Sequence, residues 1–459
     1  MSGSRRKGTA VLLLCIGLSA LWSCAIREKA HARGKLRMVD LAAIYYGARC
    51  VMHHEDPYEP AAFLREYEAS YKGKSALAFN SKADQTIVTV CINLPTSLFL
   101  VAPLALLPWG LAQNLWMILI AGLLGLAASL IWDLGACASP VVWVCLAGFL
   151  LLNWELPLVI GNLAGIAVSL CIVATWCFLK DRYVWVGVVL LAMSLVMKPH
   201  DAGFVWLYFL LAGGALRKRA LQTLILAAIL GLGASVWIAP SSPHWMHELP
   251  RNIAAASAPD TVNYPGLSGA SMQSPGPIIS LQSTLSVLWE NPHFFNPVSY
   301  FIAGLLILIW IIKVLSAPPS PERTRLALAA ISILTLLPVY HRPDDASLLL
   351  LVIPACATLW AGKSPTRVHA LVLTSAGIFF ASGIPLALLG TCAKRLSIST
   401  SALPGKLATV FLLRPTPLVL LVMGCFYLWA FIRYNPGQTD SLHETTTGNS
   451  PAAITTRTT

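Results

Sequence analysis

Residues 220–239 read ALQTLILAAILGLGASVWIA, a run of twenty residues without a charged side chain. A helix of about 20 apolar residues is long enough to cross the hydrocarbon core of a bilayer. The basic tripeptide Arg217-Lys218-Arg219 directly precedes this run, and such clusters mark the cytoplasmic ends of membrane helices. The stretch therefore predicts a transmembrane helix that begins on the cytoplasmic side.

The rest of the chain repeats this composition. Hydrophobic residues make up 56% of the 459 residues and charged residues only 11%, whereas about 25% of the residues of an average soluble domain are charged. These values exclude an ordinary soluble enzyme, a disordered chain and a coiled coil. Thirteen apolar stretches span 9–26, 87–107, 111–132, 139–160, 162–179, 183–197, 202–216, 220–239, 298–315, 326–339, 346–361, 368–390 and 416–432. We therefore expect an all-α, multi-pass protein of a cell inner or plasma membrane, with about 12 transmembrane helices and extracytoplasmic loops.

The net charge of +12 comes from short basic clusters between the apolar stretches. Such clusters are typical of loops that face anionic lipid head groups. We therefore expect the basic clusters to interact with the lipid bilayer and not with nucleic acid. Most of the eleven cysteines lie inside apolar stretches and no C-x-x-C pair occurs, so they are expected to be small buried hydrophobic residues.

The apolar stretches and the polar regions between them divide the chain into six parts. We expect an N-terminal signal-anchor helix (1–26), a first extracytoplasmic loop with an amphipathic helix and Asp40 (27–86), a transmembrane core (87–239), an extracytoplasmic loop region (240–297), C-terminal transmembrane helices (298–432) and a disordered cytoplasmic tail (433–459).

The orientation follows from the basic residues. Lys180/Arg182, Arg217–Arg219, Arg323/Arg325 and Lys363/Arg367 mark one side, which we assign to the cytoplasm. The count of crossings closes only if one segment within 87–132 does not fully cross, and its prolines favour such a broken element. Two basic regions, 27–37 and 390–415, oppose this topology because both then lie outside.

Four polar sites fall on the outer side of this topology, where ionisable side chains are costly and usually have a partner or a task. Asp40 precedes an apolar run, so it is either a helix N-cap or a catalytic carboxylate. Lys198-Pro199-His200-Asp201 is either a proline-broken helix junction with a Lys–Asp pair or a site that attracts phosphate.

The other two sites also leave two interpretations open. Tyr340-His341-Arg342-Pro343-Asp344-Asp345 is either a loop with a local Arg–Asp pair or a group in which Arg342 grips phosphate and His341 exchanges a proton. Asn153, Glu155, Gly161 and Asn162 are either the caps of a helix turn or part of the site.

Metal ligands are not assigned from the sequence. The adjacent residues His53-His54-Glu55-Asp56 cannot all converge on one ion, and His244-x-x-His247 has no further obvious ligands. The G-x-x-x-x-G-K-[ST] phosphate loop does not occur in the sequence, which disfavours a nucleotide-driven pump. We expect no obligatory cofactor and leave the metal dependence open.

These polar groups, in this order, resemble glycosyltransferase family 87, a family of membrane-embedded GT-C-type enzymes. The matching stretches are Asp40, Tyr45-Tyr46, Asp56-Pro57-Tyr58, INLPTSLFLVAPLALLPWGLAQNLW (92–116), Gly161-Asn162, Lys198-Pro199 and Tyr340 to Asp345. The chain departs from the family pattern at Leu94, at Asn162 and at His54 or Glu55. Each motif is weak alone, but the ordered set is fairly specific.

The resemblance implies a GT-C-type helix bundle that transfers a hexose, as in the family's mannosyltransferases. The donor would be a polyprenyl-phosphate sugar, the acceptor a lipid or glycan on the extracytoplasmic face, and the anomeric carbon would invert. The implied roles are catalysis by Asp40 and His341, donor-phosphate binding by Lys198 and Arg342, and acceptor binding or structural support by Tyr46, Asp56, Tyr58, Asn162 and Asp345.

Two other functions are compatible with the same residues. A secondary transporter also places Lys, Asp and His beside broken membrane helices, although the two halves of this chain show no internal repeat. A ligase that transfers a preassembled glycan from lipid pyrophosphate would use similar polar loops.

Overall fold

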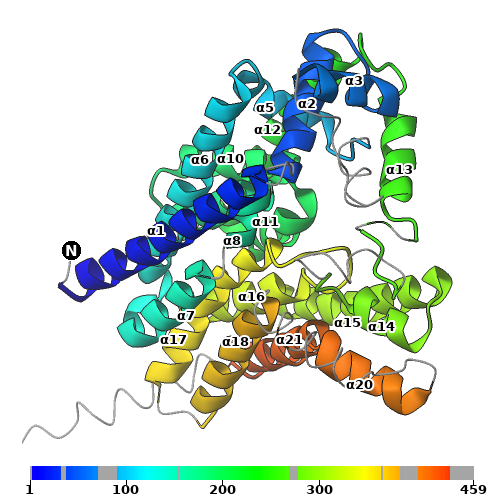
Figure 1. Cartoon of the computed structure of the whole chain (residues 1–459). Coiled ribbons are helices and arrows are strands. Elements are labelled where there is room, and N and C mark those ends of the chain that lie inside the picture. Colours follow the sequence, from blue (N-terminus) through cyan, green and yellow to red (C-terminus); the bar gives the residue numbers. More distant parts are fainter. Residues whose placement is uncertain are drawn as a thin grey trace, which may run out of the picture.

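The computed structural model is built from helices and loops (Figure 1). It describes residues 3–32, 38–70, 90–152, 155–259, 261, 263–267, 278–362, 365–382, 388 and 402–434. The α-helices are α1 (Gly3–Ala32), α2 (Val39–Met52), α3 (Pro60–Ser70), α5 (Pro95–Ala105), α6 (Trp109–Leu130), α7 (Pro140–Leu152), α8 (Glu155–Ile160), α9 (Ala164–Leu179), α10 (Val184–Met197), α11 (Pro199–Ala212), α12 (Gly214–Ile238), α13 (Trp245–Ala256), α14 (Leu281–Leu288), α15 (Pro292–Leu315), α16 (Pro321–Leu334), α17 (Ile353–Ala361), α18 (Arg367–Ala381), α20 (Leu403–Leu413) and α21 (Thr416–Arg433). Three 3₁₀ helices, η1 (Ile131–Leu134), η2 (Ala136–Ala138) and η4 (Asp345–Val352), join them.

Five of the described helices are long and apolar enough to cross a membrane. They cover Gly3–Ala25, Trp109–Leu134, Gly214–Ile238, Pro292–Leu315 and Thr416–Arg433. This result confirms the prediction of an all-α membrane protein. It does not bear out about twelve crossings, because seven further apolar helices in the described ranges have only 10–17 residues.

The long helices turn apolar side chains outward, as a protein that contacts lipid must. Ile225 and Leu232 on α12 are 62% and 67% exposed, and Phe301 on α15 is 72% exposed. Exposure of such a side chain to water, compared with its burial, costs roughly 1.5–3 kcal/mol. The exposed faces of α12 and α15 are therefore lipid-facing.

The centre of the bundle is α9, in which fourteen of sixteen residues are buried. It packs against α6, α10 and η4, and thereby joins the N-terminal half of the chain to the C-terminal half. In Figure 1 most of the first half, in blue to green, lies above the yellow and orange helices of the second half, whereas α7 lies beside α17 at the lower left.

Two regions differ from the sequence-based expectation. The helix that carries Asp40 in the region 27–86 was expected to be amphipathic, but α2 is buried on nearly all sides because α3 and α5 pack against it. The basic stretch 390–415 was expected to be an outer loop, yet it contains the apolar helix α20. The shortness of α5, about 16 Å at 1.5 Å per residue, fits the broken element expected within 87–132.

Several sequence predictions fall outside the described residues. These are the tail from 435 onward, the basic residues Arg33, Lys35 and Arg37, the residue Asn153, and the side chain of Glu155.

One cation of the basic stretch 390–415 is a buried structural group. The guanidinium of Arg414 donates hydrogen bonds to the carbonyl oxygens of Pro265, Gly266 and Ser283 and to Ser286 Oγ. It thereby fastens the loop at 263–267 to α14. A buried acceptor that loses its donor costs about 1–3 kcal/mol, so this cation stabilises the junction.

Replacement of Arg414 by Met should therefore lower the free energy of unfolding by about 3 kcal/mol or more. Thermal unfolding of the detergent-solubilised protein measures the effect. Arg433→Met is the matched control, because Arg433 lies exposed at the end of α21 and should change stability by no more than about 0.5 kcal/mol. Equal unfolding temperatures for the two variants would contradict the structural role of Arg414.

Candidate active site

Asp40 lies in the first turn of α2 and is tied to a distant segment. Asn162 Nδ2 donates to Asp40 Oδ2 at 2.7 Å, while Asn162 Oδ1 accepts from the backbone N–H of Ala164 at 2.7 Å. The N-cap position of α2 is Met38, not Asp40. The N-cap interpretation of Asp40 is therefore wrong. Asn162 binds the backbone of Ala164, the first residue of α9, and also orients the Asp40 carboxylate.

A glycine allows this close approach of α2 to the turn before α9. Gly161 has a φ of +72°, and a Cβ built on it would lie 2.8 Å from Leu41 Cβ and 3.2 Å from Met38 Cβ. The indole N–H of Trp116 donates to the Gly161 carbonyl at 2.9 Å. The Gly161-Asn162 pair thus fixes both the position and the direction of Asp40.

Lys198 marks the break between α10 and α11. Pro199 is the first residue of α11, where its missing N–H has no cost. The Lys198 ammonium contacts Asp345 Oδ1 and lies 3.4 Å from Asp201 Oδ2. The predicted helix junction with a Lys–Asp pair is confirmed, and the structure adds Asp345 as a second carboxylate partner.

The segment 340–345 wraps around the carboxylate of Asp345. His341 Nδ1 lies 3.1 Å from Asp345 Oδ2, and the Arg342 backbone N–H donates to the same oxygen at 2.8 Å. The Arg342 side chain donates to Tyr340 Oη and lies over the Tyr340 ring. The expected local Arg–Asp side-chain pair is therefore replaced by Lys198–Asp345 and Arg342–Tyr340.

A strand-like pairing holds this segment from behind. The backbone N–H of Ile279 donates to the His341 carbonyl at 2.9 Å, and that of Leu281 donates to the Leu337 carbonyl at 3.0 Å. Residues 279–281, within the region 240–297, therefore hold the backbone of His341 in place. This contact had no signal in the sequence, because backbone pairing does not depend on residue type.

The charges of these mostly buried side chains act on one another. Burial raises the pKa of Asp40, while the charges of Arg342 and Lys198 and the Asn162 hydrogen bond lower it. Burial and the charges of Asp345 and Asp40 raise the pKa of Asp344 to about 8. The structure thus brings Asp40, Lys198, Arg342 and Asp345 into one site.

His341 is fully buried in this site. Burial lowers its pKa, but the contacts with the carboxylates of Asp201 and Asp345 and their negative charges together outweigh burial and raise the pKa to about 9. Asp201 and His200 were considered from the sequence only as part of the helix junction. The sequence did contain one indication of their role. His200 and Asp201 lie in the first turn of α11, directly after Lys198 and Pro199.

Three residues expected either to bind the acceptor or to support the site have contacts within the protein. Tyr46 is buried among Tyr45, Tyr67 and Trp109. Asp56 Oδ1 accepts from the Tyr58 backbone N–H at 2.9 Å, and the Tyr58 hydroxyl donates to the Asn93 carbonyl at 2.8 Å. Of the two alternatives, acceptor contact or support, these contacts are those of support.

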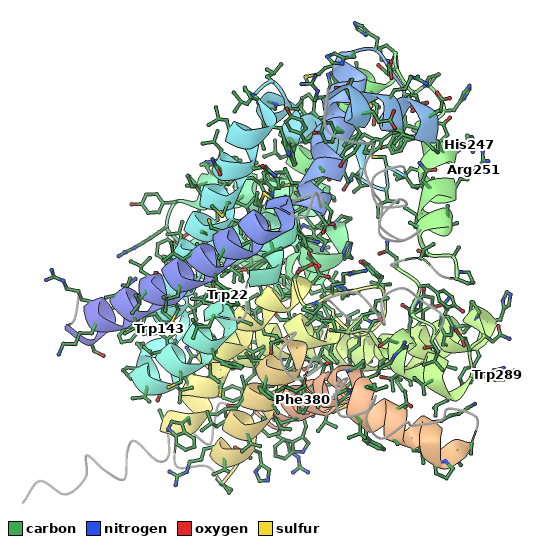
Figure 2. All side chains as sticks on the ribbon, viewed as in Figure 1. Trp22, Trp143, His247, Arg251, Trp289 and Phe380 are labelled. Atoms are coloured by element: carbon green, nitrogen blue, oxygen red, sulfur yellow. The ribbon has the colours of Figure 1, made fainter. Side chains whose placement is uncertain are left out.

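The weaker metal candidates do not form clusters within the described residues. His53 Nδ1 lies 2.9 Å from Glu66 Oε2, which ties α2 to α3. His244 and His247 are exposed, and Figure 2 shows His247 and Arg251 on the outer side of α13. Neither histidine pair joins a group of three or more metal-binding side chains in this part of the chain.

Comparison with known protein families gives a match. The family model described as Glycosyltransferase family 87 matches residues 92–338, which is more than half of the chain. This range includes Asn162 and Lys198, whereas Asp40 and the segment 340–345 lie outside it. No curated protein and no solved structure matches the chain.

Replacement of Gly161 by Ala should destabilise the protein by roughly 2 kcal/mol, because a left-handed backbone disfavours a Cβ and this Cβ meets Leu41. Gly231→Ala is the control, since its Cβ meets nothing within 4 Å inside α12 and should add about 0.5–1 kcal/mol. Thermal unfolding of both variants measures the difference, and a Gly161→Ala protein as stable as the control would refute the close approach.

Proposed function

This chain belongs to glycosyltransferase family 87 and is a membrane glycosyltransferase, and from that premise we propose that it transfers a hexose, mannose in the first instance, from a polyprenyl-phosphate donor. The acceptor is a lipid or glycan on the extracytoplasmic face. The observation that carries the proposal is the convergence of Asp40 with Lys198 and Arg342, which supplies a base and two cations in one partly buried site.

The reaction needs few groups from the protein. The acceptor hydroxyl oxygen attacks the anomeric carbon, the bond from that carbon to the phosphate oxygen breaks, and the configuration inverts. The phosphate leaves with the bonding electron pair, and the hydroxyl proton passes to the Asp40 carboxylate. A pKa raised by burial makes Asp40 a stronger base than an exposed aspartate.

The cations act on the other side of the sugar. A lipid phosphate gains negative charge as it leaves, and fixed cations in a site of low dielectric stabilise that charge. Arg342 is partly exposed and points its guanidinium over Tyr340, while Lys198 is 15% exposed and held between Asp201 and Asp345. We assign both to donor-phosphate binding.

His341 is the second catalytic residue of this proposal. Its Nδ1 faces Asp345 and Asp201 at 3.1 Å and 3.4 Å, so that only Nε2 remains for substrate. Two carboxylates behind an imidazole fix the ring orientation, as in other catalytic histidines. His341 then supports the phosphate as a proton donor through Nε2.

The orientation follows from the two ends of α9. Near its last turn, Trp176 donates to Asp133 at 3.2 Å and Arg5 pairs with the same carboxylate at 3.0 Å. Asn162 lies at the other end, about 24 Å away along sixteen residues. The basic end is cytoplasmic by the distribution of Lys and Arg, so the site faces outward.

The GT-C-type bundle and the cell inner or plasma membrane are parts of this proposal. If the seven shorter apolar helices also lie within the bilayer, the number of membrane segments agrees with the roughly twelve expected. A polyprenyl tail then stays in the bilayer while its phosphate reaches the site at the interface. Membership of a glycosyltransferase family favours sugar transfer over transport.

Purified protein given radiolabelled polyprenyl-phosphate mannose and membrane lipid extract should form a labelled glycolipid. Asp40→Asn should lower kcat by about 10²–10⁴-fold, because general-base catalysis contributes that much. Asp56→Asn is the matched control, since an amide oxygen can still accept from the Tyr58 N–H. Full turnover by Asp40→Asn would disprove its role, and uptake into vesicles without covalent transfer would favour a transporter.

Cysteine labelling tests the orientation. With the exposed Cys137, Cys145 and Cys425 replaced by Ser, a cysteine at position 247 should react with an impermeant thiol reagent on intact cells. A cysteine at position 218 should react only after lysis, since Lys218 lies exposed at the opposite, basic end. The reverse pattern would place the site on the cytoplasmic side.

A further inference from the structure

A second kind of site lies directly behind Lys198. His200, Asp201, His341 and Asp345 each offer one ligand atom, and these four atoms lie within 4.8 Å of one another. We propose that this cluster is a binding site for a divalent transition-metal ion, Zn²⁺ by its ligand chemistry. Two imidazole nitrogens and two carboxylate oxygens form a ligand set that zinc binds and magnesium does not prefer.

The distances between the ligand atoms fit a tetrahedral ion. Zinc bonds of 2.0–2.1 Å to nitrogen and oxygen give a tetrahedron whose edges are about 3.3–3.4 Å. His341 Nδ1 lies 3.1 Å from Asp345 Oδ2 and 3.4 Å from Asp201 Oδ1, and His200 Nε2 lies 3.8 Å from Asp201 Oδ1. All four ligand atoms lie within 4.8 Å of one another, which is close to this geometry.

Buried polar atoms in this cluster lack hydrogen bonds. Asp201 is 0% exposed, and within the described residues its carboxylate oxygens have only long ion-pair contacts, at 3.4 Å with Lys198 and His341 and at 3.8 Å with His200. His200 Nε2 is also buried without a hydrogen-bond partner among the described residues. His341 Nδ1 can hold only one proton although two carboxylates face it. A metal ion in place of that proton contacts both carboxylates and His200 at once.

Lys198 contacts one oxygen of each carboxylate and leaves the other oxygen available to the ion. The ammonium contacts Asp345 Oδ1 and Asp201 Oδ2, which leaves Asp345 Oδ2 and Asp201 Oδ1 for the ion. Carboxylates that bind a metal commonly have such outer hydrogen-bond partners. The backbone N–H of Arg342 adds a second outer partner on Asp345. The side chain of His200 is 36% exposed and provides the path of entry.

The ion changes the charge of the site. The two carboxylates of Asp201 and Asp345 outweigh the single charge of Lys198, whereas a divalent ion in place of the His341 Nδ1 proton adds one net positive charge next to Lys198. The site then attracts the phosphate of a lipid-linked donor more strongly, a consequence that rests on the proposed function. The binding of zinc itself does not depend on sugar transfer, so the two can fail separately.

Metal analysis of the purified, full-length protein tests the site. After treatment with a chelator and equilibration with Zn²⁺, the protein should hold one tightly bound zinc ion per chain. His200→Ala and Asp201→Asn should each weaken zinc binding by more than the roughly 10–100-fold that loss of an outer-shell partner costs. His247→Ala should retain the ion, because His247 is exposed on α13.

Cobalt substitution keeps the test decisive if a variant unfolds. Co²⁺ in the wild-type protein should show the visible absorption of a four-coordinate ion, and His200→Cys should add a thiolate-to-cobalt band. Absence of stoichiometric zinc from the wild type, or zinc binding unchanged in folded His200→Ala, would overturn the proposal. Sugar transfer by zinc-free protein would leave the proposed function intact.

Discussion

The pairing of buried charges is the constraint on which the rest of this structure depends. Asp201 and Asp345 are almost completely buried, and an unpaired buried carboxylate is too costly to keep ionised. Lys198 reaches both of them from the break between α10 and α11. Because Lys198 and Asp345 are 147 residues apart in the chain, this pairing requires the two halves of the protein to close on each other.

Around that pairing, each neighbouring segment is held by a different kind of contact. Asn162 bonds Asp40 through a side-chain amide, Gly161 permits the close approach of α2, and Ile279 pairs with the backbone of His341. The substrate-facing groups are therefore set on helix ends and turns whose directions are fixed from outside. Charged groups that are already fixed in position can stabilise the negative charge that develops on a leaving phosphate.

The sequence predicted the helical class and the main polar sites for clear physical reasons. Uncharged runs such as 220–239 can only be membrane or core helices, and Lys198-Pro199 must break a helix. Other features had no local signal. The burial of α2 results from packing by α3 and α5, and the pairing of Lys198 with Asp345, in place of a local Arg–Asp pair, depends on tertiary distance. The helix α20 was hidden by basic residues, one of which, Arg414, is buried.

The central claim is that the Asp40 carboxylate and the cations Lys198 and Arg342 face one lipid-linked sugar. An experimental structure with a non-transferable polyprenyl-phosphate sugar analogue tests it most directly. We predict that the phosphate contacts Lys198 and Arg342 and that the anomeric carbon lies between the phosphate and Asp40. A phosphate bound at the opposite end of α9, near Asp181 and Arg219, would contradict the account.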